Sequence, residues 1–320
     1  MTESTSRQAS IFDLIPTEWF SGQKRRILRI RCYEMARTTE NSFEGRFSSL
    51  LGEKALILLF WGKMQYVASP NPEHHAGAEL QFSVDTRDLK REAPEAPYTV
   101  LVTTSLGSEF ESRQVLDLNG GIVTAVLGRN AAYQLVFDNI VDLVENTTSV
   151  FGPTVVNPYT EAAPDLSESK MQTLRTSLSA LSRFPELERN RIELALHWHE
   201  EAARSPAADQ FLKRWIALEA LGMSGRENVR PLNEALALSY QISLSEAQER
   251  FGVGRIFGFR SKIVHGGHRL PIHGFLERYL DALFRDVLFQ RLGLPSEGYA
   301  AAVAALPNFN LRILLHEHCS

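Results

Sequence analysis

Two different spacings of apolar residues divide the chain into halves. Between about residues 27 and 150, apolar positions come in short runs that are rich in β-branched and aromatic residues, with turn-forming clusters such as 69–72, 93–97 and 119–121 between them. This pattern is typical of antiparallel strands. It predicts strands at 27–33, 47–61, 80–84, 98–103, 115–118, 122–126 and 133–137.

The apolar spacing changes to the period of an α-helix after three prolines at positions 153, 158 and 164. The clearest amphipathic stripe runs over 272–288, and Gly293 and Pro295 close it. Shorter stripes predict helices at 171–181, 187–203, 211–222 and 230–241 and another before His265. The predicted fold class is α+β: a β-rich N-terminal domain over 1–155, an all-α helical bundle over 165–305 and a C-terminal tail over 306–320.

Composition limits the expected binding partners and cellular location of the protein. The net charge of −4 over 320 residues gives no general attraction to nucleic acid, so a contact with nucleic acid must be local. Cys32 and Cys319 form neither a disulfide framework nor a zinc-finger spacing, which favours a cytoplasmic location. The N-terminus is polar, and the longest apolar run, 55–61, is too short for a bilayer, so we expect neither secretion nor membrane insertion.

The candidate chemistry lies in the sequence F-R-S-K-I-V-H-G-G at 259–267, which places Arg260 and His265 in an R-x4-H arrangement. One such match is expected roughly once by chance in a chain of this composition, so the motif gains its weight from its surroundings. A helical segment W-I-A-L-E-A-L at 215–221 precedes it, and the amphipathic stripe of 272–288 follows it.

Taken together in this order, these elements resemble the HEPN domain in its Apea-like branch, over about residues 166–292. The resemblance implies an up-and-down HEPN-like helical bundle that forms a homodimer in which two R-x4-6-H motifs face each other. Many members are ribonucleases in toxin, antiphage or RNA-processing systems. The resemblance therefore implies an RNA substrate, a role in antiphage defence or stress response, and no cofactor. It does not cover the first 150 residues, and we predict a sensor or recruitment function for the N-terminal domain.

The two motif residues suit RNA cleavage without a metal. The ribose 2′-hydroxyl is then the nucleophile, so the enzyme must move protons and neutralise a phosphate. His265 titrates near neutrality and can act as general acid or base, while the guanidinium of Arg260 binds phosphate oxygens as a fork. Five residues along an ideal helix place two side chains about 140° apart, so we expect Arg length, local distortion or a second protomer to bring them to one point.

Glu219 and Ser261 are the predicted supporting residues. Glu219 shares a helical face with apolar residues, and a carboxylate there needs a partner. The resemblance implies that a polar residue on this helix approaches the motif, so Glu219 is expected to orient Arg260 or His265. Ser261 matches a polar residue that commonly follows the arginine in the family, which makes it a candidate phosphate contact.

Basic residues exceed acidic ones around the motif. Residues 251–291 hold seven Lys or Arg and three Asp or Glu. This excess supplies the local positive surface that the whole chain lacks. The predicted RNA-binding residues are Arg255, Lys262 and Arg269.

Each of these residues also has a structural interpretation. His265 is equally explained as a last-turn histidine before a Gly-Gly helix stop, and Arg260 as an ion-pair partner of Glu219. The bundle would then be a catalytically silent dimeric module that binds nucleic acid or protein. We expect no metal site, because His197 and His199 are two apart on a helix and the HExxH spacing is absent.

Overall fold

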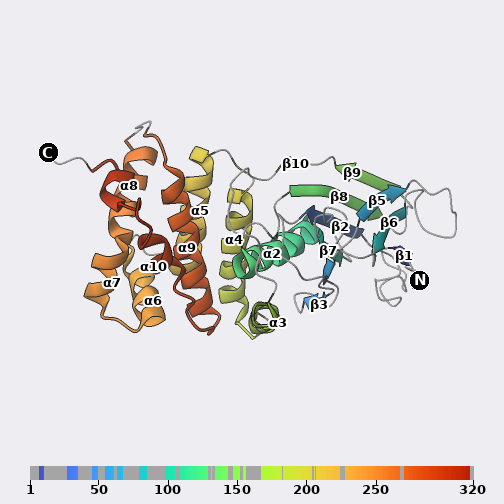
Figure 1. Ribbon diagram of the computed structural model, residues 1–320, viewed down its shortest axis with the longest axis horizontal. Helices are drawn as coiled ribbons and strands as arrows, with labels where there is room; N and C mark the ends of the chain where they lie inside the picture. The colour runs from blue at the N-terminus through green and yellow to red at the C-terminus, as the bar shows by residue number, and fades with distance from the viewer. Residues whose placement is uncertain are drawn as a thin grey trace, which may run out of the picture. The chain divides into compact units, whose positions relative to one another are not determined.

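The chain folds into two compact units, residues 1–182 and 183–320 (Figure 1). This computed structural model describes residues 7–10, 27–34, 45–49, 55–60, 63–67, 79–84, 98–105, 109–128, 131, 134–142, 147–151, 154–155, 167–181, 183–203, 205, 207–223, 228–266 and 270–317. Helix α3 (Glu168–Leu181) therefore lies in the first unit, and residues 306–317 lie in the second. The predicted domain ranges had placed α3 in the bundle and 306–320 in a separate tail.

The described strands of the first unit pair antiparallel in two sheets. The larger has the order β10-β8-β2-β7-β4-β3, with β9 paired to β8, and the smaller has the order β1-β6-β5. Strand β2 lies between β8 and β7, and its register with β8 shifts between Cys32 and Tyr33. The bounds are β1 Arg7–Ser10, β2 Ile27–Glu34, β3 Gly45–Ser49, β4 Ala55–Phe60, β5 Lys63–Val67, β6 Glu79–Val84, β7 Tyr98–Ser105, β8 Gln134–Asp142, β9 Thr147–Phe151 and β10 Thr154–Val155.

The predicted fold class is wrong, because a long helix occupies the centre of the first unit. Helix α2 (Glu109–Leu127) packs against β2, β7 and α3, over the residues for which 115–118 and 122–126 were predicted as strands. Every residue from 116 to 127 is buried. Where side chains are described the chain is mostly helical, so an N-terminal β-rich domain before an all-α bundle does not describe this protein.

The reason for this error is physical. A helix that is buried on all sides has no polar stripe, so its apolar residues form short continuous runs that a sequence cannot distinguish from buried strands. The Asn119-Gly120-Gly121 segment has the composition of a turn, yet it lies within α2. Thr124 Oγ1 donates to the Gly120 carbonyl 3.0 Å away and remains helical.

The described part of the second unit is helical. Helix α9 is its centre: it packs against α5, α6, α10 and α11 and carries the amphipathic stripe that the sequence predicts. Figure 1 shows α9 running beside α5 within this unit. The bounds are α4 Glu186–Ala203, α5 Ala207–Gly222, α6 Arg230–Tyr240, α7 Leu244–Phe251, α8 Val253–Val264, α9 Gly274–Arg291, α10 Tyr299–Ala304 and α11 Leu311–Leu314.

Helix α8, which carries the R-x4-H motif, is held at both ends by defined local geometry. Gly252 adopts the left-handed conformation (φ 60°), which ends α7 and starts α8 at the same residue. Ile256 and Phe259 are buried on the inner face of α8. The helix stops at Val264, and His265 follows as its C-cap.

Among the described residues, no helix combines the length and apolar character that crossing a bilayer would require.

Candidate functional site

The end of helix α8 determines where His265 lies. The backbone N–H of His265 donates to the Ser261 carbonyl at 2.9 Å, and the Gly266 N–H donates to the Lys262 carbonyl at 3.1 Å. His265 has left ideal helical geometry, with φ −99° and ψ −31°, and its side chain is exposed. A glycine pair follows it in the sequence. The imidazole is therefore free of the core and anchored through its backbone.

Arg260 and His265 contact each other within one chain. Arg260 Nη1 lies 3.3 Å from His265 Nε2. A guanidinium only donates, so Nε2 accepts in this contact and the proton of a neutral ring is assigned to Nδ1. The length of the arginine and the departure of His265 from the helix together overcome the 140° separation that an ideal helix imposes.

Glu219 stands behind this pair on helix α5. Its Oε1 lies 3.8 Å from Arg260 Nη2 and accepts a hydrogen bond of 2.6 Å from the indole Nε1 of Trp215. Trp215 has no exposed surface, whereas the side chains of Glu219 and Arg260 are 26% and 22% exposed. The rigid indole therefore fixes the carboxylate, and the carboxylate faces the guanidinium. A polar chain runs Trp215, Glu219, Arg260, His265 from the core to the surface.

The remaining predicted residues occupy different positions. Ser261 is half-buried and Lys262 is exposed, both on α8 beside the motif. Arg255 lies two turns earlier on α8 and forms an ion pair with Glu317. Arg269 lies outside the described residues. The structure thus brings Arg260, His265 and Glu219 to one point and leaves Arg255 engaged with the C-terminal segment.

A second polar cluster, which sequence reasoning missed, is buried among α4, α5 and α9. Asp281 Oδ1 lies 2.8 Å from His199 Nε2 and 2.5 Å from Arg214 Nη1. The His199 ring stacks on Phe284 with centroids 4.2 Å apart. Arg214 is completely buried and its Nε and Nη2 atoms have no hydrogen-bond partner. All three charged or polar side chains are at least nine-tenths buried, so the cluster is an internal tie between helices.

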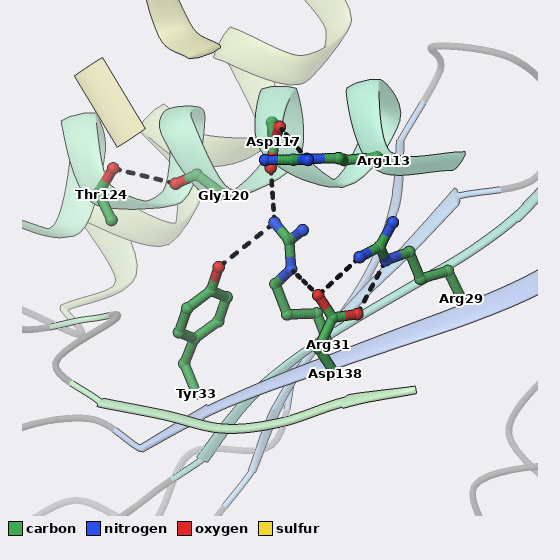
Figure 2. Close-up of polar contacts among 8 residues, drawn as sticks. All are labelled: Arg29, Arg31, Tyr33, Arg113, Asp117, Gly120, Thr124 and Asp138. Atoms are coloured by element: carbon green, nitrogen blue, oxygen red, sulfur yellow. Dashed lines mark hydrogen bonds and ion pairs between the residues drawn. The ribbon is translucent and has the colours of Figure 1, made fainter. Parts of the chain in front are cut away.

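A third cluster connects the sheet and helix α2 of the first unit (Figure 2). Asp138 accepts two hydrogen bonds of 2.8 Å from Arg29 and one of 3.3 Å from Arg31, and Arg31 Nη1 also donates to Asp117 at 2.6 Å. Burial opposes the charge of Arg31, but Tyr33 and the two carboxylates outweigh burial and raise the pKa of the guanidinium. Arg29, Arg31 and Tyr33 are alternate residues of β2, so their side chains lie on one face of the strand. Arg31 connects this face to Asp117 of α2.

The sequence carries only a partial signal for these buried clusters. Arg29 and Arg31 alternate with apolar residues on β2, which is the pattern of a half-solvated strand and hides the fact that they face a helix. Asp281 lies within the apolar stripe of α9. A charged residue on an otherwise apolar face indicates a buried charge with a partner, and this was the signal that could have identified the second cluster.

Neither buried cluster resembles a metal site. Among the residues that the structure describes, no group of three or more His, Cys, Asp or Glu is arranged to hold a metal ion. Of the three clusters, only the one at the end of α8 joins an exposed titratable side chain to a guanidinium. It is the candidate functional site.

Comparison of the chain with protein-family models, with curated proteins and with solved structures gives no match.

Proposed function

We propose that the protein is a metal-independent endoribonuclease of the HEPN type. The observation that carries this proposal is the contact of 3.3 Å between Arg260 and His265, with Glu219 behind the guanidinium. A permanently charged phosphate ligand next to an imidazole, which can accept or donate a proton, is the pair that RNA cleavage by the 2′-hydroxyl needs. The resemblance of 166–292 to the Apea-like HEPN domain supports the same function.

In the proposed reaction, the ribose 2′-oxygen attacks the neighbouring phosphorus. The bond between phosphorus and the 2′-oxygen forms and the bond to the 5′-oxygen breaks, which leaves a 2′,3′-cyclic phosphate and a 5′-hydroxyl. His265 accepts the 2′-hydroxyl proton or donates a proton to the leaving 5′-oxygen. Arg260 binds the non-bridging oxygens, on which negative charge builds up.

A homodimer completes this mechanism. One His265 serves as base and the His265 of a second protomer serves as acid when two motifs meet across a two-fold axis. Glu219 is a positioning residue, because it contacts Arg260 and not the reacting atoms. The HEPN resemblance supports a role in antiphage defence or a stress response, and we propose that the first unit senses a trigger or recruits the target.

The test is cleavage of end-labelled RNA by the purified protein in excess EDTA. Wild type is compared with Arg260→Ala and His265→Ala, and with Glu234→Gln, which breaks the exposed Arg230–Glu234 ion pair elsewhere on the second unit. Loss of a general acid or base lowers the rate by about 10²- to 10⁴-fold. We expect both motif variants to lose at least this much, Glu234→Gln to cleave normally, and the products to carry 2′,3′-cyclic phosphate ends.

Two outcomes contradict the proposal in different ways. Equal cleavage by all four proteins would mean that Arg260 and His265 are not the catalytic residues. RNA binding and dimerisation without cleavage under any condition, including lysate from infected or stressed cells, favours a catalytically silent HEPN module that binds RNA or protein.

A further inference from the structure

The C-terminal segment is anchored to the second unit immediately before its final described residues. Asn310 caps helix α11 by accepting hydrogen bonds from the backbone N–H groups of Arg312 and Ile313. Leu314 and Leu315 are 4% and 2% exposed. The chain therefore emerges from a buried anchor at residue 315, and the next two residues are presented to α8 from a fixed point.

His316 holds this segment against the R-x4-H region. Its backbone is in the left-handed region (φ 53°), which is uncommon for a residue with a side chain. The ring lies over Phe259 of α8, with centroids 6.0 Å apart and planes 18° from parallel. Its Nε2 is 2.8 Å from the carbonyl oxygen of Pro271, in the segment that follows the motif. His316 thus ties the C-terminus to elements on both sides of His265.

Glu317 occupies the guanidinium of Arg255. Its carboxylate oxygens lie 3.2 and 3.1 Å from Arg255 Nε, and one of them also contacts Nη2. The hydrogen bond from Arg255 lowers the pKa of Glu317, burial opposes this shift, and the charges of Arg255, Lys262 and Arg312 lower it further. The charges of three cations therefore favour the ionised form of this carboxylate, and one of these cations, Arg255, contacts it directly.

Arg255 and Lys262 lie on the same face of α8, because residues seven apart along a helix are about 20° from alignment. His265 is about 15 Å from Arg255 along the helix axis. Around the helix, Arg260 is about 140° and His265 about 80° from Arg255, so a single strand that contacts both the motif and Arg255 must cross α8 obliquely. Guanidinium forks bind phosphate and carboxylate with the same two-point geometry, so Glu317 makes the contact that a phosphodiester would make.

We propose that Arg255 and Lys262 form a phosphate-binding subsite for the RNA backbone, which Glu317 of the C-terminal segment occupies until RNA displaces it. This inference rests on the proposed ribonuclease function. The side chains of Arg255 and Glu317 are 38% and 35% exposed. Exchange is feasible because partly exposed ion pairs contribute little net free energy. The segment is thus an electrostatic competitor that raises the amount of RNA needed to fill the site.

The test measures RNA binding separately from cleavage. Full-length protein carrying His265→Ala is titrated into a fluorescently labelled single-stranded RNA, and anisotropy is followed at several salt concentrations. In this background Glu317→Gln is expected to bind RNA about three- to tenfold more tightly. The slope of log affinity against log salt is expected to stay unchanged, because Arg255 contacts the same phosphate in both proteins once RNA has displaced Glu317. Glu234→Gln, the matched break of a Glu–Arg pair, is expected to change neither.

A double-mutant cycle separates a phosphate ligand from a structural anchor. If Arg255 binds phosphate, Arg255→Gln in the Glu317→Gln background abolishes the gain in affinity and makes the salt slope shallower by about 0.7, the value for one phosphate on a single strand. If Arg255 merely holds the segment down, Arg255→Gln alone releases it and raises affinity as Glu317→Gln does. That second result overturns the proposal.

The failures of the two proposals are distinguishable. If Glu317→Gln leaves RNA affinity unchanged while protein with His265 intact cleaves RNA, the proposed subsite is wrong and the proposed ribonuclease activity stands. If Glu317→Gln binds RNA more tightly but no variant that retains His265 cleaves RNA, the proposed subsite stands and the proposed ribonuclease activity is wrong.

Discussion

Glu219 is half-buried between an indole N–H and a guanidinium, and these two contacts depend on different properties of the carboxylate. Trp215 needs only an oxygen acceptor at 2.6 Å, whereas Arg260 at 3.8 Å responds to negative charge. Glutamine keeps the acceptor and removes the charge. The substitution Glu219→Gln therefore isolates the electrostatic positioning of Arg260 from the packing of α5.

We expect Glu219→Gln to lower the single-turnover cleavage rate at saturating RNA about two- to fivefold, the effect of losing up to about 1 kcal/mol of ion-pair energy. RNA affinity and the urea unfolding midpoint should stay close to those of wild type, because Trp215 keeps its partner. Glu234→Gln is the control, with an unchanged rate. An unchanged rate in Glu219→Gln would show that Arg260 is positioned without this carboxylate.

Asp281 joins helices α4, α5 and α9 in the core of the second unit. It neutralises Arg214 and accepts from His199, and all three side chains are at least nine-tenths buried. Asparagine keeps the volume and leaves the guanidinium without a counter-charge, and breaking a buried pair in this way costs about 3–5 kcal/mol. We expect Asp281→Asn to lower the free energy of unfolding by this amount, measured by urea denaturation followed by circular dichroism.

The exposed Arg230–Glu234 pair provides the comparison for this prediction. Glu234→Gln should cost less than about 1 kcal/mol in the same measurement. Equal unfolding curves for Asp281→Asn and Glu234→Gln would mean that other groups satisfy Arg214.

At the scale of elements, two helical glycines differ in what surrounds them. A Cβ at Gly222, at the end of α5, would lie 2.1 Å from Leu232 Cδ2, and Leu232 is buried on α6. A Cβ at Gly258, within α8, would have no neighbour within 4 Å. The first glycine permits a close approach of two helices, and the second leaves α8 with a flexible, exposed position.

We therefore expect opposite effects from the same substitution. Gly222→Ala should destabilise the protein by about 1–3 kcal/mol, because a packed leucine must move. Gly258→Ala should stabilise it by about 0.5–1 kcal/mol, because alanine restricts the unfolded chain and favours the helix. Urea denaturation of both variants checks the pair. Stabilisation by Gly222→Ala would show that α5 and α6 are not packed as described.

For the whole molecule, the net charge of −4 does not describe the region that would meet RNA. The acidic residues of α9, Glu277, Asp281 and Asp286, are all buried. Burial raises the pKa of Asp286, against the hydrogen bonds that it accepts from Tyr240 and from two backbone N–H groups. Lys262 is exposed on α8, and Arg255 and Arg260 keep part of their surface. The local surface around the motif is therefore more positive than the composition indicates.

The proposed two-fold assembly makes a quantitative prediction for mixed proteins. If each active site needs His265 from both protomers, an equal mixture of wild type and His265→Ala in exchanging dimers retains about a quarter of the wild-type activity at constant total protein. Independent sites would retain about half. Cleavage rates across a series of mixing ratios check this, with Glu234→Gln as the active diluent. A linear decrease would contradict the composite site.

The sequence by itself determined the features that depend on local periodicity and on one short motif. The stripe over 272–288 became α9, since an amphipathic face of that length has no other way to bury its apolar residues. The glycines after His265 predicted the end of a helix there, and α8 ends at Val264. These are properties of neighbouring residues, so no tertiary information was needed.

Only the tertiary structure decided which distant residues meet. Residues 116–127 of helix α2 are buried on every side, so the apolar residues there carry no helical period, and contacts with β2, β7 and α3 determine the position of the helix. The contact of Asp138 with Arg29 joins residues 109 apart, and that of Asp281 with His199 joins residues 82 apart. Packing selects such pairs across the fold, because a charge loses its hydration when buried and must find a partner in space.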